Sequence, residues 1–435
     1  MRCSSPAGWL GLRMWLVPPS PTWTTSFRNS PRERGRRMQT VDLLITPRDP
    51  LLFRDGRPFN ADPGAAARSL PWPMPSTCAG ALRTHIGNAC SWNWFTDGPD
   101  KAKRIGFQGP FLVARSSSDS PWEIYFHAPA DAVVYELEKE CGGKETKLMR
   151  LRPWKLPEGA GCDLPHKGLL PLKVTTEQKP KGGCDFWSFD DTVRWLASGT
   201  SEEVPQRSFG RLLQETRVHV KIDPDKGTSQ EGMLFSVSYL VFPDVGGKEF
   251  GPHSTGILCR VFHNENWRPA PSALTLGGER RLAYVQEASS AQVGWPQVPD
   301  LLRNALAETR RLRIQLVTPA LFAKGWCPGW LDENLEGCPP GLEGLKLRLV
   351  AAAVPRRIPV SGWHMDRRNG KNGEKKERGP KPPRYTAPAG SVFFFEVIDG
   401  SVSPEALWLA QISDNEQDRR DGFGTMLPGV WDYAE

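Results

Sequence analysis

The stretch VDLLITPRDPLLFRDGRPF, residues 41–59, joins a strand pattern to an arginine-rich loop. Its first six residues are mostly apolar or β-branched and predict a buried strand. The following residues are rich in Arg, Asp, Gly and Pro, which is typical of a loop. This loop carries Arg48, Arg54 and Arg57. Their guanidinium groups suit phosphate oxygens, but the neighbouring aspartates could instead pair with them and brace the loop, and both interpretations stay open.

Outward from this stretch, strand patterns outnumber helix patterns. Ser76 is expected to cap a helix that runs to about Asn88 and buries Ala79, Leu82 and Ile86 on one face. Single helices between groups of strands predict an α+β fold, with two sheets each covered by a few helices. The length of 435 residues predicts two or more packed units. Further expectations are helices over 190–198, 300–308 and 404–412, alternating strands over 215–222 and 233–242, and an irregular segment over 141–185.

The net charge of +7 is concentrated at the N-terminus. Residues 1–37 contain seven Arg and one Glu, and Met38 then precedes the first strand pattern. We therefore expect translation to start at Met38 and residues 1–37 to be a spurious upstream extension or a disordered arm. The rest of the chain is nearly neutral, so net charge alone does not indicate a nucleic-acid partner.

The C-terminal third contains two segments of opposite charge. Residues 346–384 carry twelve Lys or Arg and three acids, and residues 385–435 carry two Arg and nine acids. Low-complexity residues 366–379 are interpreted as a solvated loop. The basic residues that flank this loop beside strand patterns are better phosphate candidates: Arg356, Arg357, Lys381 and Arg384.

Several classes of protein are excluded. No apolar run approaches the roughly 20 residues that a spanning helix needs, so no membrane span is expected. The nine Cys form no CxxC pair and are odd in number, which argues against a zinc ribbon and a disulfide scaffold and favours reduced thiols in the cytoplasm. The phosphate-binding GxxxxGK[ST] and dinucleotide-binding patterns are absent, and no cofactor is expected.

Two further segments place basic side chains beside glycine. In GALRTH, residues 80–85, Arg83 could face a ligand and His85 could serve as a general base, or His85 is a partly buried structural residue. In LGGERRLAY, residues 276–284, a Gly pair precedes Arg280 and Arg281, which either contact phosphates or lie on a surface hairpin.

A glycine-rich segment and a basic strand complete the candidates. Gly422, Gly424 and Gly429 either let the backbone approach a ligand closely or form a tight structural turn. Alternation also places three basic residues on one face of a strand, where they are either a nucleic-acid track or a solvated face. They are Arg217, His219 and Lys221.

In type and order, six segments resemble the family of the third subunit of the Cmr complex, the type III-B CRISPR RNA-guided effector. This family belongs to the repeat-associated RAMP superfamily. The resemblance covers residues 45–431, nearly the whole chain after Met38. Its segments are ITPRDPLLFRDGRPF (45–59), GALR (80–83), QETRVHVKID with EGMLFSVSYLVF (214–242), LGGERRLAYV (276–285), SGW with PKPPRYTAPAGSVFFFE (361–396) and GFGTMLPGVW (422–431).

The resemblance implies two ferredoxin-like (RRM-like) RAMP domains with long loop insertions, expected over 38–210 and 211–435, the second with the glycine-rich loop. It further implies a non-catalytic RNA-binding subunit in antiviral defence. Such a subunit holds the 5′ repeat-derived tag of the CRISPR RNA. It docks onto the large polymerase/cyclase-like subunit and onto a backbone RAMP subunit.

On this basis the expected RNA contacts are six arginines to phosphates and three glycines at a close backbone approach. They are Arg48, Arg54, Arg57, Arg83, Arg280, Arg281, Gly422, Gly424 and Gly429. Two other functions stay open. One is a RAMP endoribonuclease that processes precursor CRISPR RNA with His85 as general base. The other is an adaptor whose contacts are all with proteins, through the acidic C-terminal segment and exposed Trp residues.

Overall fold

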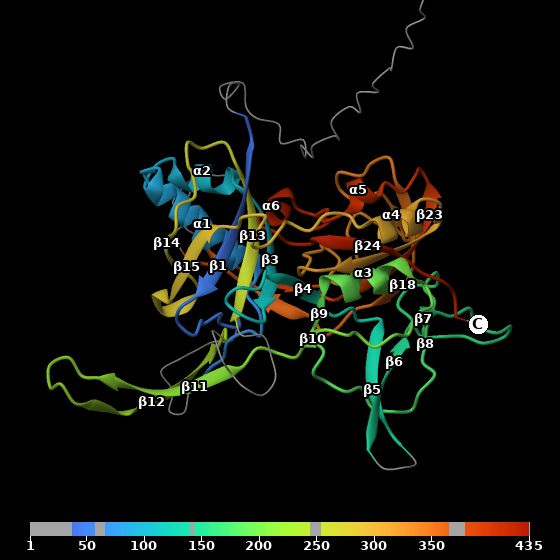
Figure 1. Ribbon diagram of the computed structural model, residues 1–435, viewed down its shortest axis with the longest axis horizontal. Coiled ribbons are helices and arrows are strands. Elements are labelled where there is room, and N and C mark those ends of the chain that lie inside the picture. The colour runs from blue at the N-terminus through green and yellow to red at the C-terminus, as the bar shows by residue number, and fades with distance from the viewer. Residues whose placement is uncertain (1–36, 57–65, 140–142, 244–253, 365–378, 435) are drawn as a thin grey trace, which may run out of the picture. The chain divides into compact units, whose positions relative to one another are not determined.

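The computed structural model describes residues 37–56, 66–139, 143–243, 254–364 and 379–434 (Figure 1). The fold is mixed α+β and dominated by strands, which confirms the predicted class. Residues 1–36 of the expected extension, Arg57 and nearly all of the loop over 366–379 lie outside the described residues. No helix in the described part of the chain is long and apolar enough to cross a membrane.

The first large element is an eight-stranded sheet in the order β10-β9-β4-β3-β13-β1-β15-β14. Strand β1 holds the predicted apolar run, and Leu43, Leu44 and Ile45 are fully buried because both faces of the sheet are covered. Antiparallel pairing with β13 sets Leu43 opposite Cys259. The strands are β1 (Gln39–Pro47), β3 (Gly106–Arg115), β4 (Glu123–His127), β9 (Phe186–Ser188), β10 (Ser208–Phe209), β13 (Ser254–His263), β14 (Ser272–Thr275) and β15 (Leu282–Glu287).

Helix α1 (Pro75–Ala89) covers one face of this sheet, followed by α2 (Gly98–Arg104). The predicted apolar face of α1, Ala79, Leu82 and Ile86, is buried in one core with residues of β1 and β13. The predicted cap is wrong. The helix begins at Pro75 after Met74, without a side-chain cap, because proline at the first turn supplies a helical φ and lacks the N–H that a cap would satisfy.

The second large element is a five-stranded antiparallel sheet in the order β17-β18-β23-β16-β24. The expected helix over 404–412 is wrong in length, because the chain leaves the helix after one turn and Leu409 adopts a φ of +58°. The strands are β16 (Arg311–Leu316), β17 (Glu336–Gly337), β18 (Lys346–Ala353), β23 (Val392–Asp399) and β24 (Met426–Val430). The remaining helices are α3 (Phe189–Ala197), α4 (Asp300–Leu306), α5 (Pro404–Leu407) and α6 (Glu416–Arg420).

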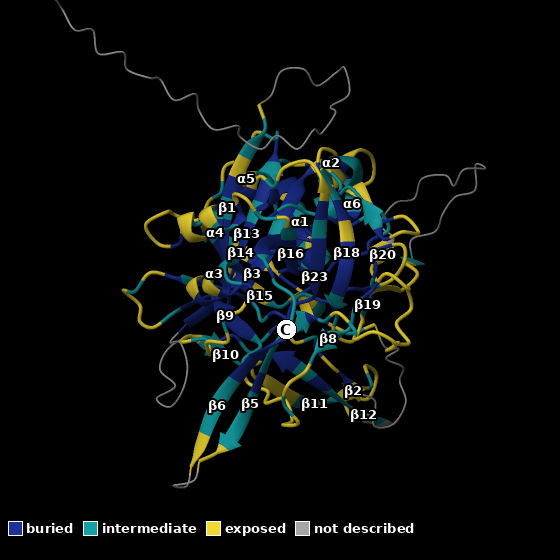
Figure 2. Cartoon of the chain, turned by 90° about the vertical axis from the view of Figure 1, so that its right-hand side faces the viewer, coloured by how far each residue is buried: buried dark blue, intermediate teal, exposed yellow. Residues whose placement is uncertain are grey.

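The two sheets share a core. Leu44 and Phe111 of the eight-stranded sheet are buried in one apolar cluster with Ile314 and Phe393 of the five-stranded sheet. Figure 2 shows this continuous buried interior and the more exposed ribbons around it. Residues Arg37–Glu435 form one unit. The expected division at 210/211 falls inside the part of the chain that builds the first sheet, since β13, β14 and β15 follow it.

Ribbons extend from these sheets. The long hairpin β11 (Gln214–Ile222) and β12 (Ser229–Leu240) is joined by β2 (Ala66–Ala67) and projects from the eight-stranded sheet (Figure 1). The segment expected to be irregular over 141–185 contains strand β6, because its residues pair with β5. The other ribbons are β5 (Ala132–Glu138) with β6 (Lys144–Arg150), β7 (Arg152–Pro153) with β8 (Leu172–Lys173), β19 (Ile358–Val360) with β22 (Arg384–Thr386), and β20 (Trp363–His364) with β21 (Gly379–Pro380).

Candidate nucleic-acid interface

Three of the sequence segments meet where β1 ends. The arginine-rich loop runs between the β14–β15 turn and the hairpin β11–β12. On one side the Arg48 backbone N–H donates to the Leu282 carbonyl over 3.0 Å, and the Leu282 N–H donates to the Asp49 carboxylate over 3.0 Å. On the other side Leu51 donates to the Leu240 carbonyl over 2.8 Å. Backbone pairing therefore holds the three segments together.

The β14–β15 turn has an unusual backbone. Gly277, Glu279 and Arg280 have φ values of +78°, +58° and +53°. The last two are not glycine, and each left-handed residue costs about 1–2 kcal/mol. A Cβ added at Gly277 would lie 2.5 Å from the Leu52 carbonyl oxygen, and the Gly278 N–H donates to that oxygen over 2.7 Å. The turn is thus pressed onto the arginine-rich loop, with Arg280 exposed at its tip.

Tyr239 of β12 links the hairpin to this turn. Its hydroxyl donates to the Glu279 carboxylate over 2.7 Å and lies 3.1 Å from His219 Nε2. The Arg281 guanidinium lies 4.2 Å from the centre of the tyrosine ring, and its Nη2 donates to Glu279 over 3.0 Å. The side chain of Arg281 is only 19% exposed. Arg281 therefore acts chiefly as an anchor of the hairpin, whereas Arg48 and Arg280 are exposed.

Burial opposes the charge on Arg281, but its hydrogen bonds to Tyr239 and Glu279 outweigh this effect and raise its pKa. Burial, followed by the nearby Glu279 carboxylate, raises the pKa of the Tyr239 hydroxyl. The guanidinium thus stays charged and the tyrosine stays protonated near neutral pH. We call Arg48, Tyr239, Glu279, Arg280 and Arg281 the hairpin-base cluster.

The hairpin continues this positive surface. Arg217 and His219 share one face of β11, as the alternation predicts, because they lie opposite Val237 and Phe235 of β12, whereas Lys221 follows at a register shift between Val220 and Ile222. His219 stacks on Phe235 with ring centres 5.4 Å apart and planes 12° apart. Arg217 pairs with Glu215 over 2.8 Å, which raises the pKa of its guanidinium. The face thus combines flat rings with a guanidinium that is engaged by Glu215.

Of the remaining arginines in the loop, Arg54 is exposed. Its backbone forms an isolated antiparallel β-bridge with Ser69, and the residue has a further interaction with another part of the chain. Its contact with RNA stays a prediction.

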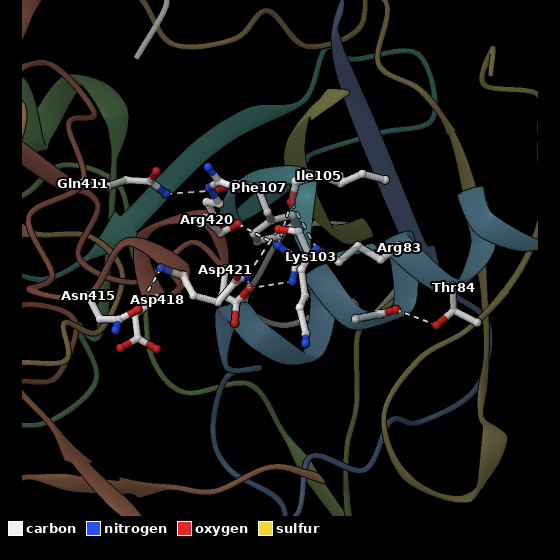
Figure 3. A network of polar contacts seen from close by, with 12 residues as sticks. Arg83, Thr84, Lys103, Ile105, Phe107, Gln411, Asn415, Asp418, Arg420 and Asp421 are labelled. Atoms are coloured by element: carbon white, nitrogen blue, oxygen red, sulfur yellow. Dashed lines mark hydrogen bonds and ion pairs between the residues drawn. The ribbon is translucent and has the colours of Figure 1, made fainter. Parts of the chain in front are cut away.

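Arg83 lies elsewhere, beside Ile105 at the start of β3 and beside Arg420 and Asp421 at the end of α6 (Figure 3). Arg83 donates to the Asp421 carboxylate over 2.5 Å and to the Arg420 carbonyl over 3.0 Å. Its Nε and Nη2 also donate to the Ile105 carbonyl over 3.1 and 2.6 Å. The side chain is 11% exposed. Arg83 therefore clamps α6 to α1 and to the start of β3.

The three glycines are buried and make close approaches within the chain. A Cβ at Gly422 would lie 2.6 Å from the Phe107 ring, and one at Gly424 would lie 2.6 Å from the Ser413 nitrogen. Gly422 and Gly424 have φ values of +95° and +80°. Gly429 would meet the Leu196 carbonyl at 2.7 Å. Internal packing thus accounts for all three residues.

His85 is partly buried and lies 3.3 Å from the Ser272 hydroxyl, at the edge of the Trp267 ring. Burial lowers the pKa of its imidazole. Its contacts are those of a structural histidine. Within the described residues no group of three His, Cys, Asp or Glu is arranged to hold a metal ion.

Sequence reasoning did not identify Tyr239 and Glu279 as members of the cluster. Each lies in a segment that was singled out, but their contact joins residues 40 positions apart, which no local pattern reveals. The exposed, alternating character of β11 was the available signal that the hairpin presents a polar face.

Comparison with known proteins identifies the family. The sequence model of the family described as CRISPR-associated protein (Cas_Cmr3) matches residues 43–431. The chain belongs to this family of subunits of the type III-B CRISPR effector complex, which confirms the resemblance. No curated protein matches.

Solved structures similar to this chain include type III-B Cmr-beta bound to cognate target RNA and AMPPnP, and the same complex bound to cognate target RNA alone. The matched chains are 17% and 16% identical, both with a TM-score of 0.37, and each match covers 81% of this chain and 86% of the other.

Proposed function

We propose that this subunit is a non-catalytic RNA-binding component that holds the 5′ repeat-derived tag of the CRISPR RNA at the hairpin-base cluster, in antiviral defence. One observation carries the proposal. Three segments separated in sequence converge at this cluster, and they leave Arg48 and Arg280 exposed beside the basic face of β11. The family membership supports the same role.

The strand orders support two ferredoxin-like units. In such a fold the strands follow the spatial order 4-1-3-2. The orders β15-β1-β13-β3 and β24-β16-β23-β18 both fit it, with antiparallel neighbours throughout. Helix α1 occupies the first crossover of the first unit, and α5 lies in the second crossover of the second unit. We place the division between the units after β15 rather than at residue 210.

The tag is expected to lie extended along the hairpin. Arg48 and Arg280 contact phosphate oxygens at its base, and Lys221 and Arg217 continue the positive track. Arg281 acts indirectly, because it holds Tyr239 and thereby fixes the direction of the hairpin. Single-stranded RNA bases are splayed and read along their edges in such sites, and the His219–Phe235 pair offers a flat surface for one of them.

Docking onto the large polymerase/cyclase-like subunit and a backbone RAMP subunit needs other surfaces. The face of the hairpin opposite the basic one exposes Val218, Val220, Ile222 and Leu234 by 67%, 42%, 53% and 57%. Exposed apolar groups on one face of a ribbon favour a protein contact. We propose this face for subunit docking, and the acidic C-terminal segment as a second contact.

The endoribonuclease alternative rests on His85. Its contacts with Ser272 and Trp267 supply no second acid–base group. Incubation with repeat RNA, compared between the wild type and His85→Ala, decides between the functions. Metal-independent cleavage that is lost in the variant would establish the enzyme and overturn the non-catalytic proposal.

Binding of a tag oligonucleotide as a function of salt concentration tests the RNA site. If about four to six phosphates are neutralised, the log–log slope is roughly −3 to −4. The double variant Arg48→Ala/Arg280→Ala removes two phosphate contacts and is expected to flatten the slope by about 1.4. The control is Lys144→Ala on the hairpin β5–β6, whose side chain is 65% exposed. An unchanged slope in the double variant would refute the assignment.

A further inference from the structure

A second basic and aromatic surface lies on the ribbon β19–β22, next to the five-stranded sheet. Tyr385 pairs with Pro359 in this ribbon. The described segments around it, 354–364 and 379–386, contain four Lys or Arg and no acid. Arg384 is engaged by Asp418 through two hydrogen bonds of 2.7 and 2.8 Å. The other three basic side chains are exposed and leave an excess of positive charge: Arg356, Arg357 and Lys381.

A cavity of about 580 Å³ opens beside this ribbon. Its wall is mainly apolar and includes Leu164, Leu169, Trp326, Ala352 and Tyr385. Its volume is within the range of about 300–1,000 Å³ that small-ligand sites occupy.

The rim of the cavity has the chemistry of a nucleotide site. Arg357 and Tyr385 both line it, and the guanidinium lies 4.0 Å from the centre of the tyrosine ring. The tyrosine is 46% exposed, so part of its side chain is open to solvent. Lys324 also lines the cavity, but its ammonium donates to the Leu331 carbonyl over 2.5 Å. The positive charge available to a ligand therefore lies on the ribbon.

We propose that this cavity accepts an unstacked base of single-stranded RNA, while Arg356, Arg357 and Lys381 contact the adjoining phosphates. Sites for single strands combine a positive path for the backbone with aromatic rings for the bases. A peptide would fill an apolar cavity equally well, but three exposed cations without an acid in the ribbon favour a polyanion. This surface is additional to the hairpin-base cluster and is built by different strands.

The test uses the full chain and a short, fluorescently labelled oligouridine strand. Binding is measured by anisotropy in the Arg48→Ala/Arg280→Ala background, so that the cavity supplies a larger share of the remaining affinity. Tyr385→Ala is expected to weaken this binding by about 5- to 160-fold, the effect of losing one stacked base. Tyr385→Phe keeps the ring and is expected to bind normally. Lys144→Ala is the control for charge lost elsewhere.

A second readout locates the strand. Oligouridine that carries 5-iodouridine is expected to crosslink to Tyr385 or Trp326, and melting curves confirm that each variant is folded. Unchanged affinity in Tyr385→Ala, with crosslinks only to the hairpin, would overturn the cavity proposal and leave tag holding intact. If Tyr385→Ala lost assembly with the other subunits but kept its RNA affinity, the cavity proposal would also be overturned, because the cavity would then hold a protein segment. If Arg48→Ala/Arg280→Ala lost tag binding and Tyr385→Ala had no effect on RNA affinity, the proposed function would stand and the cavity proposal would be overturned.

Discussion

Replacement of Arg83 by alanine tests whether this residue stabilises the fold or contacts RNA. Four hydrogen bonds join this side chain to Asp421 and to the carbonyl oxygens of Ile105 and Arg420. Breaking a buried ion pair costs about 3–5 kcal/mol. The 11% and 16% exposure of the two side chains lets water reach the site and reduces that figure. We therefore expect Arg83→Ala to lower the free energy of unfolding by about 2–4 kcal/mol.

The assay pairs denaturant unfolding with tag binding below the unfolding transition. Arg83→Ala is expected to lower the denaturation midpoint and leave the affinity of the folded protein for the tag unchanged. Arg280→Ala should show the opposite pattern. A double-mutant cycle with Asp421→Ala should give a coupling of about 1–3 kcal/mol. Weaker tag binding by Arg83→Ala at full stability would refute the clamp and restore Arg83 as a phosphate contact.

Three further predictions concern the stability of the fold. Asp131→Ala should cost about 3–5 kcal/mol in the free energy of unfolding, because the fully buried carboxylate pairs with the buried Arg313 over 2.8 Å. Gly424→Ala should destabilise by more than about 2 kcal/mol, since φ is +80° and the new methyl group would meet the Ser413 nitrogen. Burial lowers the pKa of His127 to about 4 from 6.5, so only the unfolded chain binds this proton between those values. The free energy of unfolding is therefore independent of this group above pH 6.5 and falls by at most about 3.4 kcal/mol as the pH falls toward 4, which urea titrations at each pH measure.

The sequence predicted the elements whose pattern is local. The buried strand β1 and the apolar face of α1 follow directly from the spacing of their side chains. The start of α1 and the length of α5 were missed, because a proline at the first turn and a left-handed Leu409 decide them. A division at residue 210 would separate β13 from β1 and β3, yet β13 lies between these two strands in the sheet. The sequence could not show this, since the order of strands depends on contacts between residues far apart in the chain.

The candidate site shows the same limit. Arginines in glycine-rich segments look alike in sequence, whether they face solvent or bind a carboxylate. Asp421 follows Arg83 by 338 positions, so its pairing with Arg83 could not be anticipated. The glycines of the C-terminal segment likewise gave no indication that Phe107 and Ser413 lie against them. The charge pattern of the sequence identified the arginines that are candidates for RNA contacts. The tertiary contacts then distinguished those exposed to solvent from those bound to a carboxylate.

The position of the tag in the assembled effector tests the central claim most directly. CRISPR RNA with photoreactive nucleotides in its 5′ tag is crosslinked within the complex, and the labelled peptides of this subunit are identified. The account predicts crosslinks to the segments around Arg48 and Arg280 and to the basic face of β11, with loss in Arg48→Ala/Arg280→Ala. Tag crosslinks confined to other subunits, or unchanged in that variant, would contradict it.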